Sequence, residues 1–236
     1  AVVAVAVCVG ALCARAGAAT WTATTALPQA YDGHSLVYSS GRLFQAGGIS
    51  YNGGILDGIK VFSAPASDAG ALGAWTPGPA LPEAVYYHAS AAVNGFIYVL
   101  GGFHYTDADG IVVSNVVYRA AVNPDASLGA WQEDTPLPQP VFFPSAAAWN
   151  GRIYITGGWN GAALISSVYS AEVLPDGRLG PWVAQKPLPQ AVYTHAAVSN
   201  GTRYVLGVTV NGGADIQNTV YLTKINADGS LDDWAA

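Results

Sequence analysis

The sequence predicts an all-β protein folded as a β-propeller, because one unit of about 50 residues recurs along almost the whole chain. Tryptophans mark the units, and successive units are 54, 56, 51 and 52 residues long. Five of the seven tryptophans mark the units, namely Trp21, Trp75, Trp131, Trp182 and Trp234. Each unit contains several short apolar segments separated by turn residues, and such a pattern at this period is typical of a propeller blade.

The spacing between the marker residues inside each unit is constant, although the length of the unit varies. Six residues after each Trp comes the Leu of a Leu-Pro pair, at Leu27, Leu81, Leu137 and Leu188. Seven residues further on stand His34, His88, Pro144 and His195. Thirteen residues before each closing Trp lies an aromatic residue, Phe62, Tyr118, Tyr169 or Tyr221. Several fixed offsets held together indicate one repeated structural unit rather than a chance pattern.

The first strand of each unit follows the His or Pro position and is rich in small residues, which suits the crowded innermost strand of a blade. It is expected at 35–38, 89–93, 145–149 and 196–199. A tight turn follows at Ser40-Gly41, Asn94-Gly95, Asn150-Gly151 and Asn200-Gly201. Asn-Gly between two apolar runs is the strongest short hairpin signal, because both residues accept positive φ.

The second strand is expected at 43–44, 96–100, 152–156 and 203–206. It ends in the pairs Gly47-Gly48, Gly101-Gly102 and Gly157-Gly158, whereas the fourth unit has Gly207-Val208. Paired glycines at a strand end predict that another segment packs too close for a Cβ atom. Val208 is expected to loosen that corner of the fourth unit, which also has one residue fewer before its turn.

A stretch of variable length follows the glycines, at 49–58, 103–113, 159–165 and 209–217. The third strand is then expected to include 61–62, 116–119, 168–169 and 220–221. A polar turn leads to a Leu three residues before each closing Trp. The fourth, outermost strand is expected to start at that Trp and to stop at Leu-Pro, because proline cannot donate to a strand ladder.

The segment from Asn150 to Gly158, which reads Asn-Gly-Arg-Ile-Tyr-Ile-Thr-Gly-Gly, together with Tyr169 and Trp182, resembles the kelch repeat of β-propeller proteins. The likeness covers about residues 20–236, and bacterial secreted versions have a similar Asp-Gly-Ser-Leu before the Trp, as at 228–231. The departures are Pro144 for His, Phe44 and Phe62 for Tyr, and Val208 for Gly. The resemblance implies four four-stranded blades, at about 31–80, 85–136, 141–187 and 192–236.

Trp21 is a fifth copy of the outer-strand Trp, so residues 20–26 are expected to form an extra outer strand of a blade whose other three strands are absent. In kelch-type folds a terminal strand often completes a blade made by the other end of the chain. We therefore interpret the chain as part of an incomplete ring of six or seven blades, whose open edges meet the missing blades or another chain. A closed four-bladed ring with a spare strand is the alternative.

Composition excludes several classes of protein. The chain has 236 residues, 51% of them hydrophobic, with 28 glycines and a net charge of −6, as in a turn-rich β protein with a large core. Its nine Lys and Arg residues are spread singly, which argues against nucleic acid as a partner. A weakly charged, acidic surface is compatible with neutral ligands or proteins.

Residues 1–19 are read as the back half of a secretory signal peptide, in which a short apolar run precedes a small-residue segment. An apolar N-terminal strand or anchor is the alternative. The expected location is secreted, periplasmic or at the cell surface, with no membrane span in the mature chain. Cys8 and Cys13 both lie in this run, so no disulfide or Cys-bound metal is expected in the mature domain.

The candidate binding residues come from two sets of segments that are expected to emerge on one face: those entering the innermost strands and those after the glycine pairs. Aromatic rings beside amides and carboxylates suit stacking on sugar rings or anchoring a peptide. The candidates are Tyr51, Asn52, Tyr86, Tyr87, Phe103, His104, Tyr105, Phe142, Trp159, Asn160 and Tyr193. For Tyr86, Phe142 and Tyr193, which recur at one position, packing between blades is the favoured interpretation. Binding residues concentrate in variable loops, which favours His104, Tyr105 and Trp159.

The titratable residues indicate structural roles. His34, His88 and His195 occupy equivalent places on different blades, too far apart to share a metal ion, so a structural hydrogen bond at each is expected. Repeated turns contain Asp68, Asp125, Asp176 and Asp228, whose side chains are expected to bond nearby backbone.

The sequence therefore predicts a binding module, without a cofactor, that recognises a glycan or a protein through the loop face. A galactose-oxidase-like copper enzyme, which also uses a kelch propeller, needs a Tyr linked to Cys, and no Cys follows Cys13. A cofactor-free carbohydrate-modifying enzyme resembling sialic-acid mutarotase stays open, although no catalytic residues match it. So does the propeller portion of a larger multidomain surface protein.

Overall fold

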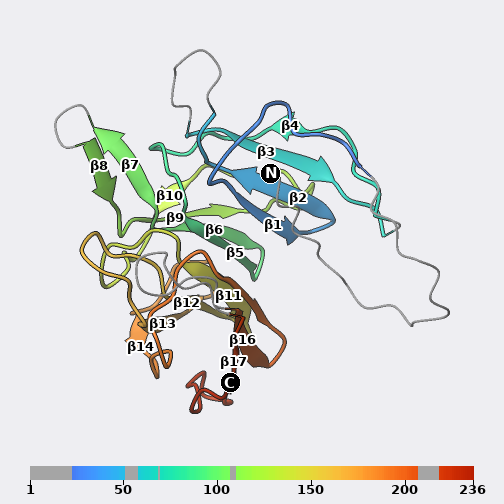
Figure 1. Ribbon diagram of the computed structural model, residues 1–236. Coiled ribbons are helices and arrows are strands. Elements are labelled where there is room, and N and C mark those ends of the chain that lie inside the picture. Colours follow the sequence, from blue (N-terminus) through green and yellow to red (C-terminus); the bar gives the residue numbers. More distant parts are fainter. Residues whose placement is uncertain (1–22, 51–57, 69, 107–109, 207–217) are drawn as a thin grey trace.

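The computed structural model describes residues 23–50, 58–68, 70–106, 110–206 and 218–236, and the regular structure within these residues is all β-strand (Figure 1). Within these ranges no helix is long and apolar enough to cross a membrane. Several predictions lie outside the described residues, namely those on segment 1–19, Cys8, Cys13, Trp21, Tyr51, Asn52, Gly207 and Val208.

Four antiparallel sheets follow one another along the chain, and each corresponds to one blade. Blade 1 contains β1 (Ser35–Ser39), β2 (Arg42–Ala46), β3 (Val61–Pro65) and β4 (Thr76–Pro77). Blade 2 contains β5 (Ala89–Val93), β6 (Phe96–Leu100), β9 (Val117–Ala121) and β10 (Gln132–Glu133). Blade 3 contains β11 (Ser145–Trp149), β12 (Arg152–Thr156), β13 (Val168–Glu172) and β14 (Val183–Ala184). Blade 4 contains β15 (Ala196–Ser199), β16 (Thr202–Leu206) and β17 (Val220–Lys224). The predicted all-β propeller fold is confirmed.

The outer strands differ from the prediction. They span only two residues in blades 1 to 3 and begin one residue after the Trp, not at it. In blade 4 the outer strand is reduced to a single bridge between Leu222 and Ala235. The indole N–H of the Trp donates to a backbone carbonyl of the preceding outer segment.

The glycine pairs have the close neighbour that the sequence predicts, and this neighbour is the next blade. A Cβ atom on Gly101 would lie 2.6 Å from the carbonyl oxygen of Val141, the residue three before Pro144. The N–H of Gly102 donates to that same carbonyl at 2.8 Å. Gly157 and Gly158 stand in the same relation to Val192. The glycines therefore allow the backbones of adjacent blades to touch.

The hairpin turns follow the prediction in three blades and not in the fourth. Both residues have positive φ at Ser40-Gly41, Asn94-Gly95 and Asn150-Gly151, as a type I′ turn requires. In blade 4 only Gly201 does, with φ 93°. The pairing of Ser199 with Arg203 leaves three residues in this turn, because the unit is one residue shorter before it.

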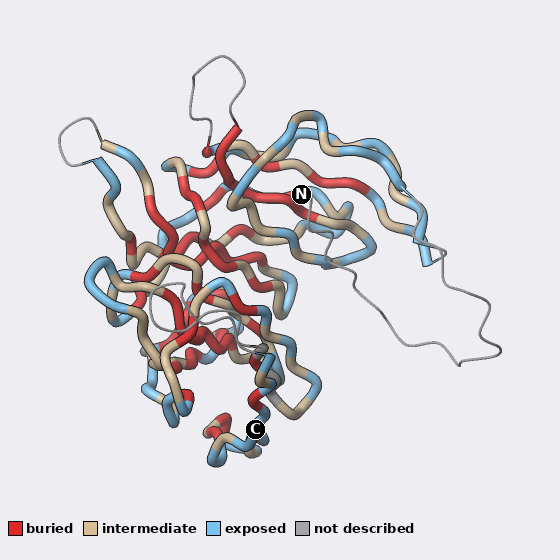
Figure 2. Tube along the Cα trace, in the orientation of Figure 1, coloured by how far each residue is buried: buried red, intermediate tan, exposed pale blue. Residues whose placement is uncertain are grey.

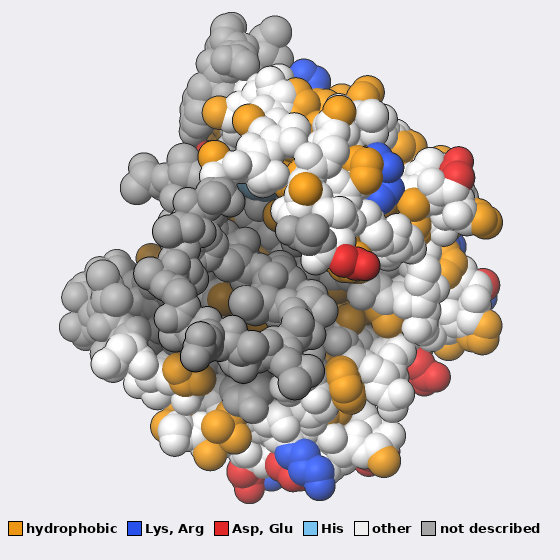
Figure 3. Space-filling view, turned by 90° about the vertical axis from the view of Figure 1, so that its right-hand side faces the viewer, with side chains coloured by type: hydrophobic (Ala, Val, Ile, Leu, Met, Phe, Trp, Pro, Cys, Tyr) orange, Lys and Arg blue, Asp and Glu red, His pale blue; other side chains and the backbone are white. Residues whose placement is uncertain are grey.

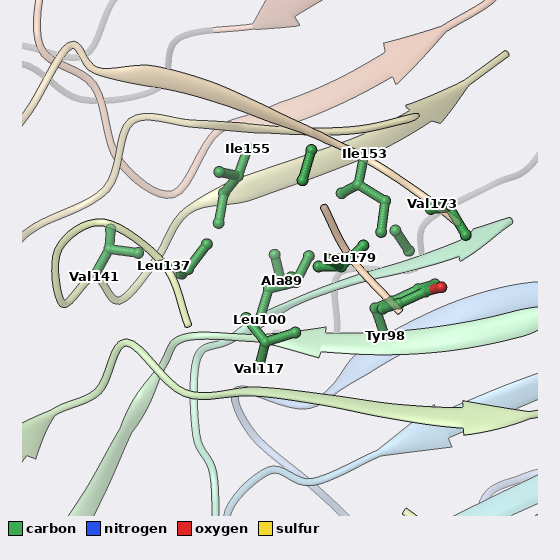
Figure 4. Packing of buried hydrophobic residues seen from close by; sticks show 12 residues of the cluster. Ala89, Tyr98, Leu100, Val117, Leu137, Val141, Ile153, Ile155, Val173 and Leu179 are labelled. Carbon is green, nitrogen blue, oxygen red and sulfur yellow. The ribbon is translucent and has the colours of Figure 1, made fainter. Parts of the chain in front are cut away.

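The hydrophobic core lies between the blades, since each sheet packs its faces on its neighbours. Figure 4 shows the cluster between blades 2 and 3, where Leu100 and Val117 of blade 2 lie opposite Ile153 and Ile155 of blade 3. Equivalent clusters join blades 1 and 2 and blades 3 and 4. In Figure 2 the buried residues accordingly follow the middle of each sheet, while the turns at its ends are exposed.

The four blades form an open row, not a closed four-bladed ring. The inner strands β1, β5, β11 and β15 pack side by side in that order, and among the described residues no comparable packing joins β15 back to β1. At the two ends of the row apolar side chains are exposed, with Tyr38 of β1 at 47% and Val198 of β15 at 64%. In the interior blades the residues equivalent to Val198 are the small Ala91 and Ala147, and both are buried.

Residues 23–26 form no strand, yet they hold the place of an outer strand of a further blade. The carbonyl of Thr25 accepts the indole N–H of Trp75 at 3.1 Å. At the other three junctions the equivalent carbonyl, four residues after the preceding Trp, accepts the next indole at 2.9 to 3.1 Å. The residues that do so are Pro79, Thr135 and Lys186. This repetition supports the interpretation of the segment as an outer strand.

Candidate functional site

The two sets of segments that the sequence assigns to one face do meet there. A bridge pairs Tyr86 with Phe103, and another pairs Phe142 with Trp159. In blade 1 the corresponding bridge pairs Asp32 with Ile49. Each bridge joins the segment that enters an innermost strand to the first residue after a glycine pair, which gathers the candidate loops at one end of the blades.

The residue just before each His or Pro position has a left-handed backbone. It is Gly33 in blade 1, with φ 64°, but Tyr87, Phe143 and Thr194 in the others, with φ between 51° and 54°. The N–H of Phe143 donates to the carbonyl of Tyr87, and that of Tyr87 to the carbonyl of Gly33, both at 2.8 Å. These bonds link three blades in series.

Such a backbone is unusual for a large aromatic residue. Left-handed geometry costs an L-residue about 1–2 kcal/mol, and only glycine adopts it freely. Non-glycine residues held in this region cluster at binding and active sites, where the surrounding structure maintains them. Because Gly33 adopts the same left-handed backbone conformation without a side chain, the rings of Tyr87 and Phe143 are not needed for the turn.

A continuous row of aromatic rings runs across this face, and we call it the aromatic strip. It consists of Tyr193, Phe143, Tyr87, Phe103 and Tyr105. Successive ring centroids are 5.7, 4.4, 5.7 and 5.3 Å apart. The strip therefore extends from blade 4 across blade 3 to blade 2. Its rings are partly exposed, except that Phe103 is buried and Tyr105 is 44% exposed.

The strip continues onto a hairpin that the sequence analysis missed. Strands β7 (Phe103–Thr106) and β8 (Gly110–Val113) form this hairpin, which stands away from the blades in Figure 1. Tyr105 and Ile111 face each other across it, and Ile111 is 54% exposed. The signal was present as Asp109-Gly110, a favoured hairpin dipeptide between two apolar runs.

One polar contact borders the strip. The hydroxyl of Tyr87 donates to the carboxylate of Asp32 in the preceding blade, at 2.5 Å. Both side chains lie at the surface around this bond. The contact fixes the orientation of the Tyr87 ring and leaves a charged acceptor beside it.

The remaining sequence candidates have other roles. Tyr86, which is 1% exposed, packs with Phe103 and Ile49 in a small core cluster, and Phe142 packs on this cluster. Trp159 lies edge-on against Phe142 at 5.1 Å, and the side-chain oxygen of Asn160 accepts two N–H groups of its own loop. His104 lies on the opposite face of the hairpin from Tyr105. Phe143 was not among the candidates, although its position matches that of Tyr87.

His88 and His195, and the turn residues Asp125 and Asp228, make structural hydrogen bonds of the kind that the sequence predicts. The Nε2 atom of His88 lies 2.7 Å from the hydroxyl of Ser35, and that of His195 lies 3.1 Å from the hydroxyl of Thr156. Each bond joins two neighbouring blades. Asp125 and Asp228 accept N–H and hydroxyl groups two residues on, and these hydrogen bonds hold the pKa of both carboxyls below its ordinary value.

His88 gives a prediction for the pH dependence of stability. Burial lowers its pKa to about 3, and the nearby His34 acts in the same direction. In the unfolded chain the imidazole titrates near its ordinary value of 6.5, so below that pH the unfolded state binds the extra proton. The free energy of unfolding should therefore fall from pH 6.5 down towards pH 3, with a slope of up to about 1.4 kcal/mol per pH unit from this group.

The matched variant is His88→Gln, which places an amide nitrogen near Ser35 but does not titrate. Urea unfolding at pH 7.5 and pH 4.5 is expected to show a smaller loss of stability for this variant than for the natural chain. Equal losses in the two proteins would show that His88 does not carry this pH dependence.

Comparison with known proteins agrees with this geometry. The kelch motif family matches residues 140–174, which form the loop entry, β11, β12 and β13 of blade 3. Beta-scruin of Limulus polyphemus is 30% identical over 147 residues, covering 61% of this chain and 14% of that protein. The human Kelch repeat and BTB domain-containing protein 12 is 32% identical over 117 residues, covering 47% of this chain and 18% of that protein.

The chain belongs to the kelch-repeat family. A solved structure of YjhT has the same fold as this kelch chain, with a TM-score of 0.67 and 17% identity. The match covers 88% of this chain and 65% of the YjhT chain. This kelch chain thus spans less than a fifth of the two curated relatives and about two thirds of the YjhT chain.

Proposed function

We propose that this kelch propeller is a binding module and that the aromatic strip, together with Ile111 on the hairpin, is its surface for a protein partner. The observation that carries the proposal is the presence of large rings on left-handed backbone at Tyr87 and Phe143, where glycine suffices in blade 1. The export of the protein, predicted from residues 1–19, belongs to the same proposal.

The shape of the strip favours a protein over a small molecule. Its rings follow one another across three blades, and the exposed pair Tyr105 and Ile111 continues it onto a projecting hairpin. Tyrosine and other aromatic residues are enriched in protein interfaces because they bury a large area with few rotatable bonds. Figure 3 shows the side of the molecule away from the hairpin, where hydrophobic side chains are scattered among a few charged ones.

A glycan is the second candidate, and the contact between Tyr87 and Asp32 favours it. A carboxylate beside a partly exposed aromatic ring offers a sugar both a hydrogen-bond acceptor and a stacking surface. The mutarotase-like activity stays an untested prediction.

The experiment is a selection of peptides from a displayed library on the purified chain, followed by affinity measurements on variants. Tyr105→Ala and Ile111→Ala should each weaken the selected peptides about tenfold, because each removes an exposed apolar contact of about 1–2 kcal/mol. Trp149→Ala is the matched control: Trp149 is 40% exposed, but it lies at the other end of its strand, beside the Asn150-Gly151 turn.

Peptides whose affinity falls equally with Trp149→Ala and Tyr105→Ala would contradict the proposed surface. If no peptide is enriched and a glycan array instead shows a sugar whose binding is lost in the Asp32→Asn variant, the protein partner is wrong and the glycan takes its place.

A further inference from the structure

The junction between blades 1 and 2 lacks contacts that the other junctions have. At the others, the N–H of the Leu three residues before each Trp donates to a side chain of the preceding outer segment. Leu72 donates to Thr24 at 3.3 Å, Leu179 to Asp134 at 3.1 Å and Leu231 to Gln185 at 3.1 Å. In the outer segment of blade 1, which precedes blade 2, the equivalent residue is Gly78, which has no side chain. The N–H of Leu128 consequently has no hydrogen-bond partner among the described residues.

The adjoining position is changed as well. The hydroxyl of Thr25 donates to the carbonyl of Leu72 at 2.7 Å, and that of Thr135 to the carbonyl of Leu179 at 2.8 Å. Pro79 holds the equivalent place before Leu128 and has no donor. Neither the N–H nor the carbonyl of Leu128 therefore has a side-chain partner from the preceding outer segment, although the residue is only 9% exposed.

A further hydrogen bond of the other junctions is also missing between blades 1 and 2. The hydroxyl of Tyr98 donates to the carbonyl of Gly177, and that of Tyr154 to the carbonyl of Gly229, at 2.6 and 3.0 Å. Between blades 1 and 2 the corresponding residues are Phe44, which has no hydroxyl, and Ala126.

The glycines at these turns matter because the turn rests on a side chain of the previous blade. A Cβ atom on Gly229 would lie 2.4 Å from the side chain of Arg152, which shows how closely that turn approaches. Ala126 has a Cβ atom at this place, with φ 61°, and it faces Arg42 as the counterpart of Arg152.

A cleft of about 180 Å³, which we call the junction cleft, lies at this junction, and Gly78 and Pro79 line it together with Asp125 and Ser127, the neighbours of Ala126. Its polar lining is formed by Arg42, Ser63, Thr76, Asp125 and Ser127, with Leu128 and Val61 as apolar lining. The volume is far above the about 10–15 Å³ that a single water needs.

The charged groups of the junction cleft are held in place by hydroxyl groups. The Nη2 atom of Arg42 donates to the hydroxyls of Ser63 at 3.0 Å and Thr76 at 3.2 Å, which directs the guanidinium along the wall. Asp125 is fixed by Ser127 through one carboxylate oxygen. No ion pair joins Arg42 to Asp125 in the described part of the chain.

We propose that the junction cleft is a second binding site, separate from the aromatic strip, for a small neutral polyhydroxylated molecule such as a monosaccharide or polyol. A hydroxyl group both donates and accepts, so adjacent hydroxyls satisfy the guanidinium of Arg42 and the N–H of Leu128 as well as the carboxylate of Asp125. Because Arg42 and Asp125 carry opposite charges, the lining as a whole favours neither an anion nor a cation. Val61 and Leu128 offer an apolar surface to the C–H face of a sugar ring.

The test restores the residues that close the other junctions. In the double variant Phe44→Tyr with Ala126→Gly, the new hydroxyl reaches the carbonyl of residue 126 and the turn settles onto Arg42. The variant should be at least as stable as the natural chain, since it gains a buried hydrogen bond and loses a left-handed alanine, and its thermal unfolding midpoint verifies that it is folded.

The probes are methyl α-mannopyranoside, methyl β-galactopyranoside and myo-inositol, titrated into labelled protein while the amide of Leu128 and the Nε–H of Arg42 are followed by NMR. We expect saturable shifts of both signals with at least one probe. These shifts should weaken tenfold or more in the double variant and in Arg42→Gln, and stay unchanged in Phe143→Gly. The last variant separates this site from the aromatic strip.

Two results would overturn the proposal. One is the absence of saturable shifts at Leu128 and Arg42 with all three probes, which means that the junction cleft holds water only. The other is equal binding by the natural chain and a folded double variant, which places the site elsewhere.

Discussion

The substitution Gly101→Ala is expected to lower the free energy of unfolding by about 2–5 kcal/mol. Gly101 has φ 66°, which costs an alanine about 1–2 kcal/mol, and the new Cβ would lie 2.6 Å from the carbonyl oxygen of Val141. Relieving this contact moves the backbones of blades 2 and 3 apart, and overpacking of this kind costs about 1–3 kcal/mol more. Chemical unfolding followed by tryptophan fluorescence measures the loss.

Gly95→Ala is the matched control for this prediction. Gly95 also has a left-handed backbone, with φ 78°, but nothing lies within 4 Å of its Cβ position. Its substitution should therefore cost only the backbone strain of about 1–2 kcal/mol. If the two variants lose the same stability, the close approach of the next blade is not what the glycine pair accommodates.

The second large effect is expected for Asp134→Ala, at about 3–5 kcal/mol of destabilisation. The side chain of Asp134 is 3% exposed, lies 2.9 Å from Nε of Arg119, and accepts the N–H of Leu179 in blade 3. Its removal leaves a largely buried guanidinium without its partner and a backbone donor without an acceptor, and breaking a buried pair in this way is strongly destabilising.

A surface pair in the next blade provides the comparison. Arg152 and Glu172 lie 3.7 Å apart, and the side chain of Glu172 is 64% exposed. Exposed ion pairs contribute about 0–1 kcal/mol, so Glu172→Ala should change stability little. A loss below 1 kcal/mol for Asp134→Ala would show that the link between blades 2 and 3 does not depend on this carboxylate.

The fold was largely predictable because its determinants are local and repeated. Small residues in the innermost strands, the Asn-Gly turns and the glycine pairs each impose a geometry that depends on a few neighbouring residues. The offsets between them, held over four units, then give the order of strands within a blade. The inner strands β5, β11 and β15 consequently begin and end where the sequence places them.

The weaker parts of the prediction depend on contacts between blades. A sequence does not show that the Trp indole bonds to the preceding blade, so the outer strands were expected to be longer than they are. The same limit applies to the aromatic candidates. Tyr86 and Tyr87 are neighbours in the sequence, yet Tyr86 is buried within a small core cluster and Tyr87 packs on the edge of that cluster, partly exposed.

Both candidate sites lie at positions where equivalent residues of the repeated units differ in type. Gly33 becomes Tyr87 and Phe143 on the loop face, and Tyr98 and Gly177 become Phe44 and Ala126 beside the junction cleft. A sequence comparison between the units of this one chain could have found both places. It could not have shown that the changed residues gather around one surface and one cleft.

The central claim is that the rings of Tyr87 and Phe143 are kept for binding and not for folding. The measurement that tests it most directly is the double variant Tyr87→Gly with Phe143→Gly, in which each residue is replaced by the one that blade 1 carries at Gly33. Its unfolding free energy and its affinity for the selected peptides are determined together. We predict stability within about 1 kcal/mol of the natural chain, because relief of left-handed strain offsets the lost ring contacts, and at least a tenfold loss of affinity. A variant that unfolds several kcal/mol more easily, or one that binds as tightly as the natural chain, would contradict the claim.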